Sequence, residues 1–243
     1  MKTLAFAKRC ALEILRDPLN LMFGLGFPVV LLLLLSAIQA SIPVALFEIS
    51  YLAPGIAVFG LSFITLFSAT LISRDRESAL LSRLYSTPLR PLDFILGYTL
   101  PLMPISIVQC AVCYAVSFML GLQISANIII AIIAIIPISV LYIGLGLLCG
   151  SIFSVKQVGG ICGALLTNLS AWLSGIWFDI ELVGGVFEKI ARMLPFIHAV
   201  ELERVMVSGC FTEAVMHLIM VIGYAIFILA SAAFAFLRQM KKV

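Results

Sequence analysis

Long apolar stretches alternate with short charged segments along this chain. No charged residue occurs in five intervals, which are residues 18–47, 49–73, 94–155, 157–178 and 214–237. A charged side chain at the centre of a bilayer costs roughly 2.5–3.5 kcal/mol on the mildest scales. A helix needs about 20 residues to cross about 30 Å of hydrocarbon. Four intervals therefore predict one membrane-spanning helix each, and the longest interval predicts two.

We predict an all-α membrane protein with six transmembrane helices, folded as a single domain over residues 1–243. The spans are expected at residues 20–38, 52–72, 94–120, 126–151, 157–177 and 214–237. A glycine and polar residues near 121–125 indicate the turn between the third and fourth spans. Composition supports this class, because 63% of the residues are hydrophobic and 11% are charged, whereas soluble domains have about 45–50% and about 25%.

The segment before the first span predicts an amphipathic helix over residues 3–16. Its apolar arc consists of Leu4, Ala7, Ala11, Leu12 and Leu15, with Arg9, Glu13 and Arg16 on the opposite side. Phe6 and Lys8 depart from this pattern. Because Asp17-Pro18 breaks the chain before the apolar run, we favour a helix lying on the membrane surface over an extension of the first span.

The segment between the fifth and sixth spans predicts two short helices. Helical patterns cover residues 186–194 and 198–207, and Pro195 separates them. These patterns are too short and too charged to cross a bilayer. We therefore expect short external re-entrant helices, or helices lying on the outer membrane surface, before the last span.

The distribution of charge predicts the orientation of the chain in the membrane. Six spans place both chain ends on one side, which then carries 12 of the 15 basic residues. The positive-inside rule makes this side cytoplasmic, so we expect a multi-pass protein of the cell membrane with both termini in the cytoplasm. The basic residues flank spans and are not interleaved with aromatic residues, which argues against a nucleic-acid partner.

Several kinds of chemistry are disfavoured by the residues present. The chain has no Gly-x-x-x-x-Gly-Lys-[Ser/Thr] phosphate loop, so we do not expect it to hydrolyse ATP. Cys110 and Cys113 lie in a predicted span without a second pair, which indicates buried thiols and not a metal site. The acidic residues lie outside the predicted spans, and His217 is a lone histidine near the end of the sixth. An intramembrane enzyme and an ion-coupled secondary transporter are therefore the less favoured alternatives.

Residues 73–93 form the longest connection on the predicted cytoplasmic side. After the charged run Arg74–Glu77, the pattern predicts a short helix that ends at Thr87-Pro88. One face of this helix carries Leu80, Leu81, Leu84 and Tyr85. Charges followed by an apolar face suit docking into a groove on a soluble partner, although a solvated connector has the same pattern.

Two groups of motifs resemble a known family. The first comprises Ser-Arg-Asp-Arg-Glu at 73–77, Leu-Tyr-Ser-Thr-Pro at 84–88 and Ile-Leu-Gly at 95–97. The second comprises Leu-Ser-Gly-Ile-Trp-Phe at 173–178, Pro-Phe-Ile-His-Ala-Val-Glu at 195–201, and Arg204. In this order, and with this chain length and predicted topology, they resemble the membrane subunit of ABC type 2 (ABC-2) exporters.

The resemblance implies a permease driven by a separate ATP-binding subunit, which would hold ATP and Mg, so no cofactor is expected on this chain. A second copy or a related permease would pair with it in the lipid. The implied contacts with the ATP-binding subunit are Arg74, Asp75, Arg76, Glu77, Leu84, Thr87 and Pro88. The implied external gate consists of Phe178, Pro195, Glu201 and Arg204. A solvated charge cluster and a charged outer rim are the alternatives for these two groups.

Asn168 and Ser170 are polar residues within the predicted fifth span. They either line a transport pathway or pack between helices, since polar groups in lipid need partners. The spans hold few polar residues, which favours outward transport of a hydrophobic cargo such as an amphiphilic drug, a peptide or a lipid. A lipid-linked polysaccharide is the alternative cargo. Its pathway would be expected to offer more aromatic surface than a chain with two Trp provides.

Overall fold

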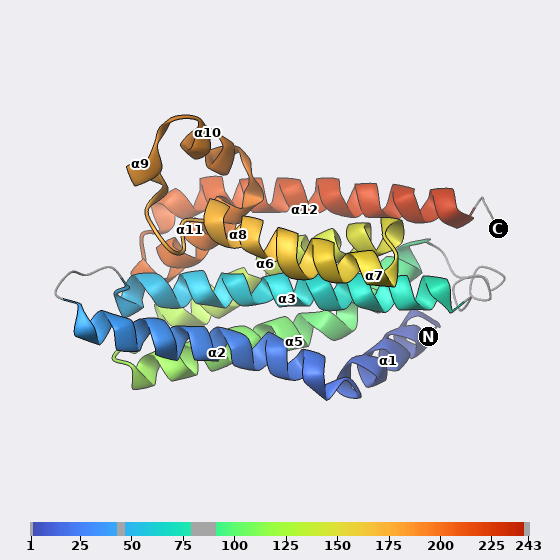
Figure 1. Cartoon of the computed structure of the whole chain (residues 1–243), viewed down its shortest axis with the longest axis horizontal. Helices are drawn as coiled ribbons and strands as arrows, with labels where there is room; N and C mark the ends of the chain where they lie inside the picture. Colours follow the sequence, from blue (N-terminus) through green and yellow to red (C-terminus); the bar gives the residue numbers. More distant parts are fainter. Residues whose placement is uncertain (1, 43–46, 79–90, 241–243) are drawn as a thin grey trace.

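The computed structural model describes residues 2–42, 47–78 and 91–240, and the regular secondary structure in these ranges is helical. Five of the described helices are long and apolar enough to cross a membrane. They are α2 (Pro18–Ser41), α3 (Ile49–Glu77), α5 (Pro91–Met119), α6 (Asn127–Ile152) and α12 (Phe211–Met240). They run side by side along the long axis of the molecule (Figure 1). The end of this bundle that holds both chain termini is called the terminal end below, and the opposite end the far end.

The predicted fifth span is a composite helix. It consists of α7 (Val155–Val158), the π-helix η1 (Gly159–Leu166) and α8 (Thr167–Leu173). In η1 the backbone hydrogen bonds reach five residues back, which widens the helix. The helix stops at Leu173, four residues before the predicted end of the span at residue 177. A turn follows it, in which Gly175 has a φ of +70°.

Helix α3 lies at the centre of the bundle. In its most apolar window 83% of the residues are buried, against 22% in the corresponding windows of α2 and α12. Two glycines of α6 allow α3 to approach closely: a Cβ on Gly146 would lie 2.4 Å from the carbonyl oxygen of Thr65, and one on Gly150 would lie 2.5 Å from that of Ala69. The Thr65 hydroxyl donates a hydrogen bond to the Tyr142 carbonyl across this contact, at 2.7 Å. Small residues thus allow backbone contact between the two helices.

Helix α1 (Lys2–Leu15) lies at the terminal end, at an angle to the bundle (Figure 1). The predicted apolar arc is wrong in part, because Phe6 does not interrupt the buried side. Its ring packs edge-on against Tyr98 of α5, with the centroids 5.0 Å apart, and Cys10 and Ile14 are buried beside it. Leu4 and Leu15 of the predicted arc are 70% and 62% exposed. The helix therefore has two apolar sides, one against α5 and one outside the bundle.

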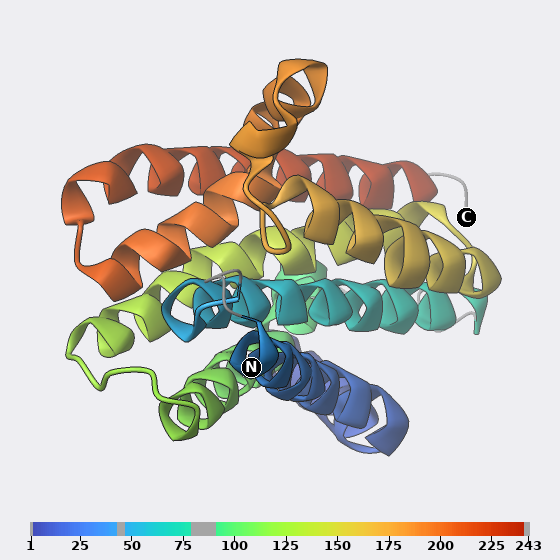
Figure 2. The ribbon, with the colours of Figure 1, turned by 60° about the vertical axis from the view of Figure 1, so that its left-hand side comes forward.

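Three short helices lie at the far end. They are α9 (Ile180–Val183), α10 (Gly185–Met193) and α11 (Pro195–Ser208). Figure 2 shows α9 and α10 (orange) standing away from the other helices. Pro195 occupies the first turn of α11, where its missing N–H costs nothing. Unlike α10, α11 is largely buried, and it packs against α3, α6 and α12.

Candidate functional site

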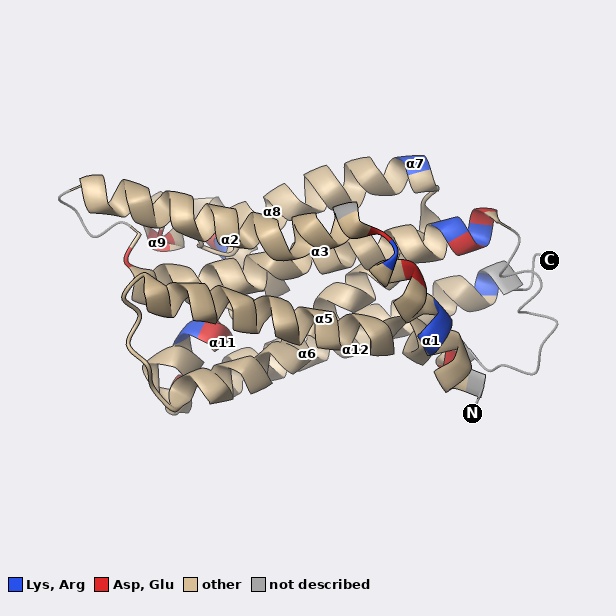
Figure 3. Ribbon diagram, turned by 90° about the horizontal axis from the view of Figure 1, so that it is seen from below, with Lys and Arg blue, Asp and Glu red and all other residues tan. Residues whose placement is uncertain are grey.

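Charged residues gather at the two ends of the molecule, and the middle of the bundle is nearly free of them (Figure 3). At the terminal end the largest run is Arg74–Glu77, the last four residues of α3, which we call the α3 quartet. Successive residues of an α-helix are turned by about 100° because one turn takes 3.6 residues. The four side chains therefore point around the helix and contact different elements.

Asp75 joins α3 to α1 and α5. It is 2% exposed, and its two carboxylate oxygens accept hydrogen bonds from the Arg9 guanidinium at 2.5 and 2.6 Å. The Tyr98 hydroxyl donates a third hydrogen bond, at 2.8 Å. Hydrogen bonding to Asp75 raises the pKa of Arg9 above its usual value. This two-pronged, hydrogen-bonded pair holds α1 against the bundle.

Arg76 and Glu77 join α3 to the turn between α6 and α7. Arg76 donates hydrogen bonds to the carbonyls of Ser151 and Phe153 at the end of α6. Glu77 accepts one from the backbone N–H of Val155, the first residue of α7, at 2.9 Å. The positive charge of Arg76 thus lies at the C-terminus of α6, and the negative charge of Glu77 lies at the N-terminus of α7. Both charges interact favourably with the helix dipoles.

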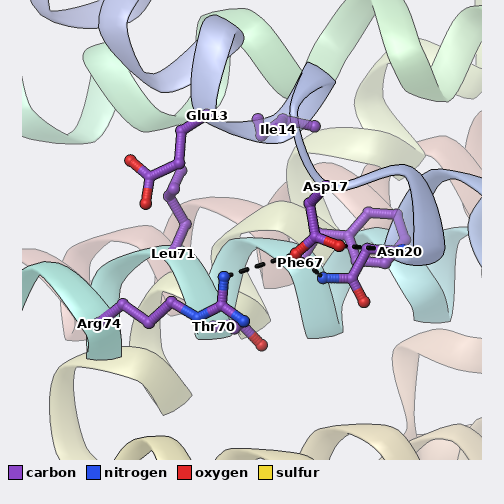
Figure 4. A pocket seen from close by; sticks show the side chains of 8 residues that line it. All are labelled: Glu13, Ile14, Asp17, Asn20, Phe67, Thr70, Leu71 and Arg74. Carbon is purple, nitrogen blue, oxygen red and sulfur yellow. Dashed lines mark hydrogen bonds and ion pairs between the residues drawn. The ribbon is translucent and has the colours of Figure 1, made fainter.

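Arg74 reaches the junction of α1 and α2. Its guanidinium lies 3.4 Å from Asp17, beside a cavity of about 30 Å³ (Figure 4). Asp17 also accepts a hydrogen bond from the side chain of Asn20, at 2.7 Å, and caps α2. The Arg74 side chain is 50% exposed, so this ion pair is screened by solvent and weak.

The predicted contacts with a partner subunit divide into three groups. All four side chains of the α3 quartet have partners within the chain, but Arg74 and Glu77 are exposed at the terminal end whereas Asp75 and Arg76 are not. Leu84, Thr87 and Pro88 lie outside the described residues. Sequence reasoning missed Arg9 and Tyr98 as partners of Asp75. The sequence did offer one signal for a buried ion pair: Asp75 stands between two arginines, next to apolar segments that could cover it.

An open apolar groove runs along η1 and α8. Its volume is about 440 Å³, and it is lined by Gly160, Ala164, Leu165, Asn168, Leu169, Trp172, Leu173 and Phe187. Asn168 is exposed in this groove, and its side-chain amide donates to the Ala164 carbonyl at 2.8 Å. Ser170 lies on the other side of α8. It is buried and shares a hydrogen bond with the Tyr142 hydroxyl, at 2.8 Å. The structure thus places Asn168 in a groove and Ser170 in helix packing.

Arg204 of α11 is the centre of a second charged cluster, at the far end. It is 8% exposed, and its guanidinium lies 3.4 Å from the centroid of the Tyr51 ring. It donates hydrogen bonds to Glu201 at 2.7 Å and to the Gly175 carbonyl at 2.9 Å. Cavities of about 270 and 500 Å³ adjoin Arg204. Arg204 therefore ties α11 to α3 and to the turn after α8.

The other two predicted gate residues have different surroundings. The Phe178 ring lies between Trp172 and Phe187, with centroid distances of 5.7 and 6.1 Å. Pro195 is buried at the start of α11. Phe178 thus borders the groove, whereas Pro195 shapes a helix.

Glu203 is fully buried, which the sequence did not predict. One carboxyl oxygen accepts a hydrogen bond from the Tyr114 hydroxyl of α5, at 2.8 Å. The other oxygen has no hydrogen-bond partner among the described residues. Burial raises the pKa of Glu203 to about 8. Helix α11 turns this residue into the bundle, so Glu203 is not part of a charged outer rim.

The sequence suggested that His217 is a lone histidine, but the structure places it next to His198. Its Nδ1 lies 3.0 Å from Nδ1 of His198, and Nε2 of His198 lies 3.0 Å from the Arg192 carbonyl oxygen. A carbonyl can only accept, so His198 donates through Nε2. When His198 is neutral, its Nδ1 accepts a hydrogen bond from Nδ1 of His217. The pair connects α12, α11 and the end of α10.

The chain was compared with known protein families. The family model described as ABC-2 type transporter matches residues 1–207. This range includes the α3 quartet, the groove on α8 and the Arg204 cluster. A comparison with curated proteins finds no match.

Proposed function

Because the chain belongs to the ABC-2 type transporter family, we propose that it is the permease subunit of an ATP-driven exporter and moves an amphiphilic drug-like molecule, a peptide or a lipid outward. A separate subunit supplies the ATP-binding site with its ATP and Mg. The chain sits in the cell membrane with the terminal end in the cytoplasm. The α7–η1–α8 helix is the fifth span in chain order and brings the five continuous spans to six.

The observation that carries this proposal is the α3 quartet at the terminal end. Arg74 exposes charge there, in the last turn of α3 and shortly before residues 79–90, in which a docking helix is predicted. The same four residues contact α1, α2, α5 and the α6–α7 turn. A soluble subunit bound at this end would therefore act on several spans through one short segment.

The groove along α8 supports a pathway next to a second copy of the chain. Asn168 is a polar side chain exposed within a span, and Trp172 beside it is 53% exposed. Polar groups facing hydrocarbon are costly. A second permease or an amphiphilic cargo would cover them. The apolar lining favours such a cargo over the alternative, a lipid-linked polysaccharide.

Co-purification tests the partner. The chain is expressed with the ATP-binding subunit and purified in detergent, and the amount of bound subunit is measured. We expect a stable complex, weakened by Arg74→Glu at the exposed end of α3. Arg192→Glu, an exposed charge reversal at the far end, is the control and should not weaken it. Equal loss in both variants, or no complex with the parent chain, contradicts the proposal.

A further inference from the structure

We propose that Arg76 and Glu77 are positioning residues that transmit movement of the terminal end of α3 to the α7–η1–α8 helix. This inference rests on the proposed function, since the movement begins at the ATP-binding subunit. It adds a route by which movement passes from the end of α3 to the α6–α7 turn, both of which lie at the terminal end.

The α6–α7 turn is short and is held from both sides. Helix α6 ends at Ile152 and α7 begins at Val155. The last carbonyls of a helix and its first N–H groups lack partners within the helix. Here Arg76 satisfies carbonyls at the end of α6, and Glu77 satisfies an N–H at the start of α7. Two adjacent residues of α3 thus hold both helix ends.

The contact continues from the turn into η1. Ala69 of α3, Val158 and Cys162 form a small buried cluster. This packing keeps α3 and η1 side by side but is not directional. The charged hydrogen bonds of Arg76 and Glu77 are directional, so they fix how far α3 can slide past the turn.

The π-helix provides a place where the composite helix can change shape. Single π-turns within α-helices are frequent at functional sites, because the wider turn can be gained or lost locally. A Cβ added to Gly159 or Gly160 would meet no atom within 4 Å. No neighbouring element covers the helix at these two residues, so packing there does not oppose a change of shape. A displacement of α7 can then reposition α8 and the groove at Asn168.

The test uses the complex of the chain with its ATP-binding subunit in lipid nanodiscs. Cys210, the exposed cysteine, is changed to serine, and Leu169→Cys places a thiol in the groove. The rate of maleimide labelling is measured with and without ATP and vanadate. In this parent complex we expect ATP and vanadate to change the rate several-fold.

Two variants of one residue separate the local hydrogen bond from a charge contact with the partner. Glu77→Ala removes the acceptor for the Val155 N–H, so the change in labelling rate should be lost. Glu77→Gln keeps a side-chain oxygen that accepts the same hydrogen bond, so the change should be retained. If the negative charge of Glu77 acted only on the partner, both variants would lose it. Arg76→Ala and Arg76→Lys form a second pair, in which the lysine restores part of the response.

ATP hydrolysis by each complex shows whether the subunits still assemble. The inference predicts that Glu77→Ala keeps hydrolysis and loses the change in labelling. An unchanged response in Glu77→Ala overturns the inference and leaves the proposed function standing. Loss of the response in Glu77→Gln as well overturns it in favour of a partner contact. Absence of both hydrolysis and response in the parent complex overturns the proposed function itself.

Discussion

At the scale of single residues, the protein holds its buried charged side chains in three different ways. Asp75 is paired with Arg9 and also bound by Tyr98. Arg204 is paired with Glu201 and bound by a backbone carbonyl. Among the described residues, Glu203 forms no ion pair, and one of its carboxyl oxygens has no hydrogen-bond partner. Since an unpaired charge in a protein interior is costly, Glu203 is held mainly in its neutral form at pH 7.

Glu203 should make the folded protein less stable as the pH rises. The ordinary carboxyl pKa of 4.5 applies to the unfolded chain, and burial raises it to about 8 in the folded chain. The contribution of Glu203 is therefore fully present below about pH 4.5, falls by about 1.4 kcal/mol per pH unit between there and about pH 8, and is lost above that pH. We expect Glu203→Gln to remove this loss, as measured by thermal unfolding in detergent between pH 6 and 9.5. Glu213→Gln, at an exposed acid, is the control and should unfold like the parent.

The prediction fails if Glu203→Gln keeps the pH dependence of the parent protein. That outcome would mean that the carboxyl is ionised in the folded state at neutral pH.

The ion pairs of Asp75 and Arg74 should differ in their contribution to stability. Asp75→Asn removes the buried charged partner of Arg9 and leaves the guanidinium paired with Glu13 alone, at 2.6 Å. Because Arg9 is partly exposed, we expect a loss of about 1–3 kcal/mol, below the roughly 3–5 kcal/mol of a fully buried pair. Arg74→Gln breaks a half-exposed pair and should cost less than about 1 kcal/mol. Chemical denaturation of the two variants measures the difference, and equal losses would contradict it.

Residue environments were the hardest feature to predict from sequence. A charged run at a helix end looks the same whether it meets a partner or its own chain, so Asp75 was predicted to contact a partner. Glu203 lies next to other charged residues in the sequence, and nothing in that pattern marks it as buried. In the structure α11 is covered on several sides, and its burial is set by tertiary packing.

At the scale of elements, an apolar residue in a membrane-spanning helix can face either lipid or the protein interior, so apolar character alone does not predict burial within the protein. The charge-free intervals predicted α2, α3, α5, α6 and α12, because charge is excluded from any segment that crosses a bilayer. They did not predict the π-helix, whose hydropathy is that of an ordinary span. In α1 both sides are apolar, so the pattern alone could not decide which side packs on α5.

Contact between α3 and α6 depends on glycine. A side chain on Gly150 would collide with backbone, which cannot turn away as a side chain can. We expect Gly150→Ala to cost about 1–3 kcal/mol through overpacking. Gly26→Ala is the control, because a Cβ there meets no atom within 4 Å. Thermal unfolding of both variants tests this, and equal stability of the two would show that the helices do not pack as closely as described.

At the scale of the whole molecule, two charged clusters lie at opposite ends and share two connecting helices. Helix α3 carries the quartet at the terminal end and Tyr51 at the far end. The α7–η1–α8 helix starts at Val155, bound by Glu77, and is followed by Gly175, bound by Arg204. Movement at the terminal end can therefore be transmitted to the far end through both α3 and the α7–η1–α8 helix. This arrangement suits a permease driven from one side of the membrane.

The match to the ABC-2 type transporter family confirms the family that the sequence motifs predicted. The central claim, an ATP-driven permease, is tested most directly by transport in proteoliposomes. They contain the chain with its ATP-binding subunit, and the flux of a fluorescent amphiphilic dye is followed after ATP is added to the side of the terminal end. We predict dye movement away from that side. It should require ATP and both subunits. Equal dye movement without ATP, or by the chain without the ATP-binding subunit, would contradict the account.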